Sequence, residues 1–217
     1  VFRAVMRDAE ALFDLQALEA AVEAARAHQP AVVREALQAV GPADLLALVR
    51  GLLRERVPLP GFAALLEAVA AEPCLRQPGE RVRWLTALRE RLAGWWVRDV
   101  VAARARLGPV AWARPRPDAE AALLDRVVVD GGEVRLRLSP VERRAWRSRV
   151  LAGQEVLPPL LVCSTRSRPA FAALLARGAP HVAVLAAGEL QAVDLAVPGE
   201  PGGPAAQWFD APEPGGA

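Results

Sequence analysis

The chain has 217 residues, enough for one or two domains with a sizeable core, and its formal net charge is +2. Its two cysteines, Cys74 and Cys163, lie far apart and outside any CxxC pair, which excludes the disulfide-rich and zinc-module classes and favours a reducing, cytoplasmic setting. No run of about 18 apolar residues predicts a membrane helix, and the chain opens without a signal-peptide pattern. It is therefore interpreted as a soluble piece of a longer protein.

The first half of the chain is predicted to be all helical. Apolar residues recur there at spacings of three and four, which places them on one face of each helix. Prolines and glycines separate the helices, and Val57–Gly61, with two prolines and a glycine, cannot continue one. In the first helix the apolar face consists of Leu12, Leu15, Leu18 and Val22. The expected helices cover residues 8–28, 31–41, 42–56, 62–70 and 79–107.

The second half is predicted to mix strands and helices. A short strand is expected at 110–112, and residues 134–138 alternate apolar and charged side chains, the period of a half-buried strand. Ser139 to Glu142 forms a capping box with proline at the first helical position, which starts a helix to about 152. The apolar run 157–163, a helix at 168–177 and the strand at 181–185 then indicate a parallel strand pair with a crossover helix.

Three segments follow from this change of pattern. Residues 1–107 are expected to be a helical subdomain and residues 108–197 an α/β subdomain, so the fold class is α+β. Glycine, proline, alanine and glutamate dominate from residue 198 onward. Such a composition buries little apolar surface, and residues 198–217 are therefore predicted to be disordered.

Charge is distributed unevenly along the helical part. Residues 1–80 carry 8 arginines against 11 acidic residues, a balance of −3, whereas residues 81–116 carry 9 arginines against 2 acidic residues, a balance of +7. A basic segment of this kind could attract nucleic acid, acidic lipid or an acidic protein surface. It is also what a solvated, arginine-rich helix face produces in a protein without lysine.

Tryptophans accompany these arginines. Trp84, Trp95 and Trp96 lie in the expected basic helix, and tryptophan interleaved with arginine can stack nucleic-acid bases. An Arg/Trp-rich nucleic-acid-binding module is therefore one functional hypothesis. Neighbouring residues cannot share one helix face, so one of Trp95 and Trp96 is expected in the core and the other at an interface.

Catalytic patterns are weak. Cys163 to Arg168 is similar to a cysteine phosphatase loop, but only four residues separate the two, where that loop requires five. A buried strand-end cysteine is the expected alternative. His28 and His181 lie in different elements without a suggested partner, and no phosphate-binding glycine pattern occurs. We therefore expect no enzymatic activity, no cofactor and no metal.

Two separated motifs stand out in the chain. The first is Leu52-Leu53-Arg54-Glu55-Arg56-Val57-Pro58 followed by Leu65-Leu66-Glu67-Ala68-Val69-Ala70. The second runs from Pro159-Leu160-Leu161-Val162-Cys163-Ser164 through Arg168-Pro169 to Glu189-Leu190. In this order the motifs resemble those of the FHIPEP family, the export gates of flagella and injectisomes, and the resemblance covers roughly residues 10–190.

The resemblance implies a function in protein export. Members have an N-terminal membrane bundle and a cytoplasmic domain that forms a ring of nine under the export channel. Chaperone–substrate complexes and other export-apparatus subunits bind that domain at the cytoplasmic face of the inner membrane. The chain would then be a docking and ring-forming module that binds no nucleic acid; a purely structural ring spacer remains the alternative. A ferredoxin-like or ring-building-like sheet with helices on one face is implied for the α/β part.

The family reading also has consequences for particular residues. The turn at Val57–Gly61 would reverse the chain and pack the two flanking helices against each other as an antiparallel pair. The negative and positive segments of one copy would meet head to tail in a ring, a contact that closes when its rotation permits. The residues predicted at this partner or ring interface are Arg54, Glu55, Arg81, Arg83, Arg89 and Trp96.

Overall fold

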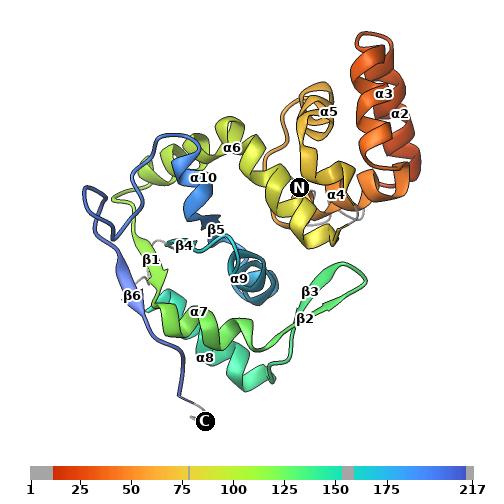
Figure 1. Cartoon of the computed structure of the whole chain (residues 1–217). Coiled ribbons are helices and arrows are strands. Elements are labelled where there is room, and N and C mark those ends of the chain that lie inside the picture. Colours follow the sequence, from red (N-terminus) through yellow and green to blue (C-terminus); the bar gives the residue numbers. More distant parts are fainter. Residues whose placement is uncertain (1–11, 78, 153–158, 214–217) are drawn as a thin grey trace. The chain divides into compact units, whose positions relative to one another are not determined.

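The computed structural model describes residues 12–77, 79–152 and 159–213 (Figure 1). The chain divides into two compact units between Trp96 and Val97, inside a long helix. The boundary predicted from the sequence, at residues 107 and 108, follows the end of that same helix. Within the described ranges no single helix is long and apolar enough to cross a bilayer, and the pair 30–39 and 42–54, which together reach that length, is bent by 92°.

The first unit consists of helices, as predicted. Pro30 and Pro42 occupy the first turns of their helices, where a missing N–H costs nothing, and the Asp14 side chain accepts a hydrogen bond from the Ala17 N–H. The elements are α2 (Leu15–Arg26), α3 (Pro30–Ala39), α4 (Pro42–Arg54), α5 (Phe62–Ala71), the 3₁₀ turn η1 (Pro73–Arg76) and the first part of α6 (Arg81–Ala105).

Helix α5 packs mainly on α3 and also contacts α2, rather than pairing with α4 as the family reading implied. The break at Val57–Gly61 is confirmed, since α4 ends at Arg54 and α5 begins at Phe62. Phe62 is only half-buried, with its ring 6.5 Å from that of Phe13. The core lies instead between the faces that carry Leu18, Val22, Val33, Ala36, Leu45, Val49, Leu52, Leu65, Leu66, Val69, Leu88 and Leu92.

The start of the first helix differs from the prediction. Its expected beginning at Asp8 lies outside the described residues, and α2 begins at Leu15 after the Asp14 cap. Leu18 and Val22 are buried as predicted, but Leu12 and Leu15 are exposed. The predicted helical spacing is present in α2. Leu12 precedes the helix and Leu15 is its first residue, and no described segment buries either side chain.

The second unit is built on a four-stranded sheet. Its strands are β1 (Trp112–Pro115), β4 (Leu160–Cys163), β5 (Ala183–Ala186) and β6 (Gln207–Phe209), in the order β5-β4-β1-β6. Every pairing is parallel, including the predicted pair of β4 and β5 across helix α9 (Arg168–Leu175). The α+β class is confirmed, and the all-parallel order differs from a ferredoxin-like sheet, which contains antiparallel neighbours.

A hairpin and two helices connect β1 to β4. Helix α7 (Pro117–Leu124) leads into β2 (Val127–Asp130), which pairs antiparallel with β3 (Glu133–Leu136). Gly131 and Gly132 make the turn with φ of 58° and 81°, values that favour glycine at both positions of a tight hairpin. The strand at Glu133–Leu136 and the Ser139–Glu142 capping box of α8 (Pro140–Leu151) were predicted. The partner strand β2 was not.

Both faces of the central strand are covered. Leu161 and Cys163 of β4 contact one apolar cluster, which α7, α8 and α9 complete with residues such as Trp146 and Phe171. Leu160 and Val162 point to the opposite face and are also buried. Helix α10 (Ala187–Gln191) contacts β5, and Arg98 of α6 hydrogen-bonds to the Val193 carbonyl just beyond it. Both faces of this sheet are therefore covered, whereas the resemblance implied helices on one face only.

The predicted disordered tail is the clearest difference. Residues 207–209 form β6 at the edge of the sheet, in parallel register with β1 (Figure 1). The physical reason is one residue: Phe209 is buried in the apolar cluster of the second unit and holds an otherwise polar, proline-rich segment. Composition averaged over the segment hides a single aromatic anchor of this kind.

Candidate docking surface

The arginines of the basic segment 81–116 are mostly paired inside their own unit. In the first unit Arg81 lies 2.9 Å from Asp44 and Arg91 lies 2.9 Å from Glu72, while Arg89 pairs with Glu55 at 2.8 Å. The segment's +7 balance therefore overstates its exposed positive charge.

The arginines of the second unit also have partners within their own unit. Arg98 and Arg104 donate to the backbone carbonyls of Val193 and His181. Arg114 pairs with Glu200 at 3.1 Å and Arg116 with Asp210 at 3.2 Å. A nucleic-acid-binding surface requires cations turned to solvent and exposed rings between them. Seven of the nine arginines are instead used within the fold.

Three of the residues predicted at an interface lie in or beside the core of the first unit. The side chains of Arg89 and Glu55 are 2% and 13% exposed, and the Arg89 guanidinium also lies over the Trp96 ring, 4.7 Å from its centroid. Trp96 is itself buried. A charge removed from water is stabilised only if it is paired, and here the Glu55 carboxylate and the ring face share that task. Arg89 and Trp96 thus hold α6 in the first unit, and neither side chain is exposed in the single chain.

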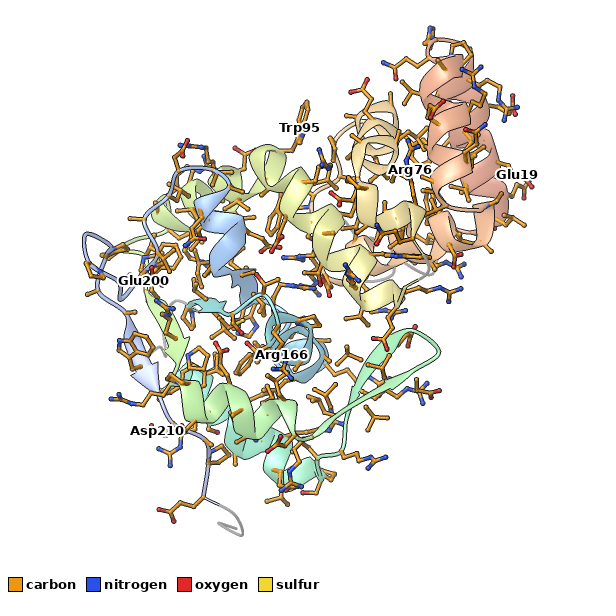
Figure 2. All side chains as sticks on the ribbon, viewed as in Figure 1. Glu19, Arg76, Trp95, Arg166, Glu200 and Asp210 are labelled. Carbon is orange, nitrogen blue, oxygen red and sulfur yellow. The ribbon has the colours of Figure 1, made fainter. Side chains whose placement is uncertain are left out.

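The remaining predicted residues lie at the surface. Arg54, Arg81 and Arg83 are exposed, and Arg54 belongs to the last turn of α4, away in sequence from the other two. Trp95, which the prediction left out in favour of Trp96, is 62% exposed and projects away from α6 (Figure 2). The signal was present in the sequence, because Leu88, Leu92 and Trp96 recur every four residues and so define the buried face.

Sequence reasoning also missed a buried polar group at the end of β4. Ser167, Arg168 and Glu189 are almost fully buried in the second unit. The Glu189 carboxylate accepts a hydrogen bond of 2.9 Å from the Ala186 N–H, and the Glu120 carboxylate accepts one of 2.9 Å from the Ser164 N–H. These contacts satisfy backbone groups where strands β4 and β5 end, so this part of the family motif fixes the sheet.

Cys163 lies in this group, and its chemistry is that of a core residue. Burial raises the pKa of the Cys163 thiol to about 12, and the carboxylates of Glu120 and Glu189 add to this effect. A nucleophilic cysteine requires a lowered pKa and access to solvent. Cys163 has neither property, because its thiol is buried and its pKa is raised. Among the described residues no cluster of histidine, cysteine and carboxylate groups could hold a metal ion.

The raised pKa predicts how stability depends on pH. An unfolded cysteine ionises near its ordinary value of 9.0, whereas folded Cys163 stays neutral until about pH 12. The neutral Cys163 thiol therefore makes its full contribution to the free energy of unfolding below about pH 9. Between about pH 9 and pH 12 this contribution falls by about 1.4 kcal/mol per pH unit. Denaturant titrations at pH 8 and pH 10.5 should show a steeper loss for the native chain than for Cys163→Ala. Partial burial and the nearby Glu72 carboxylate also raise the pKa of the Cys74 thiol, so Cys74→Ala should remove a smaller part of the slope. Equal slopes for all three chains would contradict the burial of the Cys163 thiol.

Before any comparison, the class is that of a helical unit followed by a parallel α/β unit, in which most arginines of 81–116 are paired within their own unit and Trp95 is exposed. The chain belongs to the FHIPEP family, whose model matches residues 1–194. No curated protein sequence is significantly similar to it.

Solved structures share the fold at low sequence identity. The Chlamydia pneumoniae CdsV protein is 13% identical with a TM-score of 0.70, over 97% of this chain and 58% of that one. Nonameric EPEC SctV-C is 13% identical with a TM-score of 0.71, over 96% and 60%. The C-terminal domain of InvA is 18% identical with a TM-score of 0.68, over 86% and 57%. The chain thus spans about three-fifths of the length of these relatives.

Proposed function

We propose that this chain is part of the cytoplasmic domain of a type III secretion export gate. The family match over residues 1–194 is the observation that carries the proposal. The fold likeness to CdsV, SctV-C and the C-terminal domain of InvA, proteins of the same kind, supports it. In this role the chain acts by binding other proteins at the cytoplasmic face of the inner membrane.

Its partners are of two kinds. The relative SctV-C is described as nonameric, which supports self-association of this chain into a ring of nine. The relative CdsV is described in a complex with CdsO, which supports contacts with other subunits of the export apparatus. Docking of chaperone–substrate complexes completes the proposed role.

The internal pairing of the arginines changes which residues would make the ring contact. Exposed charge pairs contribute only about 0–1 kcal/mol each, and most arginines of 81–116 already have partners in their own unit. Interfaces instead depend on a few aromatic anchors that lose contact with water. Trp95 is an exposed aromatic side chain of this kind. Arg83 lies on the same helix, is exposed, and was predicted at the interface from the sequence. We place both in the ring contact.

Assembly on a membrane tests this proposal. The chain, attached through a terminal tag to vesicles to raise its effective concentration, should form oligomers of up to nine copies, measured by cross-linking and mass. Trp95→Ala should raise the concentration needed for assembly at least about tenfold, the effect of an aromatic hot spot. Trp95→Phe, which keeps most of the ring area, should be much closer to the native chain.

Two results would contradict the proposal. A chain that stays monomeric when crowded at low salt would exclude the ring. Equal assembly by the native chain and Trp95→Ala would exclude the Trp95 contact while leaving the ring itself in place. A parallel titration with nucleic acid at two salt concentrations separates the rival class, because binding by counterion release falls steeply with salt.

A further inference from the structure

The end of the chain forms a separate structural feature, which we call the C-terminal strap and define as residues 198–210. It begins at the buried Pro198, turns, and returns as β6 along the edge of β1 (Figure 1). The family match ends at residue 194, so the strap lies outside the part of the chain that the family model describes.

One side chain anchors the strap. Phe209 is buried, and its ring meets that of Phe171 edge to face at a centroid distance of 6.1 Å. Its carbonyl accepts a hydrogen bond of 2.9 Å from the Arg116 N–H, which continues the parallel ladder beyond the strand. The edge of β1 therefore offers two things to a strand: backbone groups to pair with and an apolar pocket for one aromatic ring.

The other contacts of the strap are polar and lie at or near the surface. The Gln207 side chain donates a hydrogen bond of 2.8 Å to the Ala152 carbonyl, and the Arg114 side chain is 16% exposed. Arg114 lies over the Trp208 ring at 4.8 Å and donates to the Pro198 carbonyl at 2.8 Å, and it pairs with Glu200. Trp208, Glu200 and most of the turn between them are exposed, as Figure 2 shows for Glu200 and for Asp210 beyond the strand. Polar contacts of this kind at the edge of a unit each contribute little compared with burial of the core, so the strap can leave the sheet without unfolding the unit.

An edge strand whose partner has left is a site for another strand. Its unpaired N–H and C=O groups can pair with any extended segment, and the pocket selects the side chain that the segment carries. The segment that fits both features is the strap itself. In an assembly of identical copies, the strap of a neighbour has the same sequence and a high effective concentration.

We propose that the edge of β1, with the Phe209 pocket, is a docking site for an extended peptide, and that the strap of a second copy of this chain can occupy it in place of the copy's own strap. This rests on the proposed assembly for its effective concentration, but the docking site belongs to the single chain. Strap exchange would link neighbouring copies by pairing backbones rather than by charge.

A peptide of residues 204–213, fluorescein-labelled at its N-terminus, tests the docking site by fluorescence anisotropy with the full-length chain. Phe209→Ala empties the pocket, and this chain should bind the peptide at least about tenfold more tightly than the native chain, whose strap competes. Trp208→Ala loosens the strap without changing the core and should bind with intermediate affinity, which keeps the test valid if Phe209→Ala fails to fold. A peptide that itself carries Phe209→Ala should not bind. Equal binding of both peptides, or no preference for the loosened chains, would overturn the docking site.

Mixing full-length chains tests the second copy as the occupant. The Phe209→Ala chain supplies an empty pocket, and the Arg114→Ala chain supplies an intact strap that its own unit holds less well. Native mass spectrometry should find a 1:1 heterodimer in the mixture, above the dimer level of either chain alone. Peptide binding without this heterodimer would overturn strap exchange. Vesicle-bound assembly of a chain that shows no exchange would leave the proposed function standing, so the two failures can be told apart.

Discussion

Replacing Glu55 with alanine is expected to destabilise the first unit by about 3–5 kcal/mol, because it leaves a buried guanidinium without its carboxylate. Arg89 is 2% exposed and pairs with Glu55 at 2.8 Å. The face of Trp96 still attracts the cation, but a ring quadrupole does not replace an ionic partner. A loss of this size is a large fraction of the roughly 5–15 kcal/mol that stabilises a domain.

Chemical denaturation of Glu55→Ala, Arg89→Met and the double variant separates the pair from its surroundings. Arg89→Met removes the buried charge, so the double variant Glu55→Ala/Arg89→Met should recover much of the stability that Glu55→Ala loses. Asp44→Ala breaks the exposed pair with Arg81 and serves as the matched control, with an expected loss of about 0–1 kcal/mol. If Glu55→Ala behaves like Asp44→Ala, the Arg89 pair is not buried in solution.

The sequence predicted those features that arise from local patterns. Proline at the first turn of α3 and α4, the Ser139–Glu142 capping box and the parallel pair around α9 all follow from residues that are close in the chain. The two FHIPEP motifs predicted the family, which the comparison confirms.

What the sequence did not predict depends on contacts between distant residues. Arginines that looked like an exposed basic face pair with distant acids: Arg91 with Glu72, 19 positions away, and Arg114 with Glu200, 86 positions away. The strand β6 forms because Phe209 reaches a pocket lined by Phe171, which composition alone does not reveal. Trp95 and Trp96 could have been assigned from the four-residue spacing of Leu88, Leu92 and Trp96, which places Trp96 on the buried face of the helix.

Phe171→Ala is the second change with a large expected effect, and it acts in the second unit. Phe171 is fully buried in α9, and its ring meets Trp146 at 6.3 Å and Phe209 at 6.1 Å, both edge to face. Deleting a buried phenylalanine side chain costs about 3–5 kcal/mol, since the cavity cannot close completely. Each aromatic pair adds about 0.5–1.5 kcal/mol to what burial alone provides.

The structure also predicts where this loss appears first. Phe171 forms part of the pocket that holds Phe209, so its truncation should loosen β6 before it unfolds the sheet, and the Arg116 N–H that bonds to the Phe209 carbonyl should exchange with solvent faster. Hydrogen exchange with mass spectrometry over residues 112–116 measures this effect, and a denaturant titration measures the global loss. Phe171→Leu, which keeps most of the volume, should lose clearly less than Phe171→Ala. Trp95→Ala, a larger truncation at the surface, should change stability by no more than about 0.5 kcal/mol. Unchanged exchange at 112–116 in Phe171→Ala would mean that the Phe209 ring is held by other contacts, and the pocket would then have to be assigned to different residues.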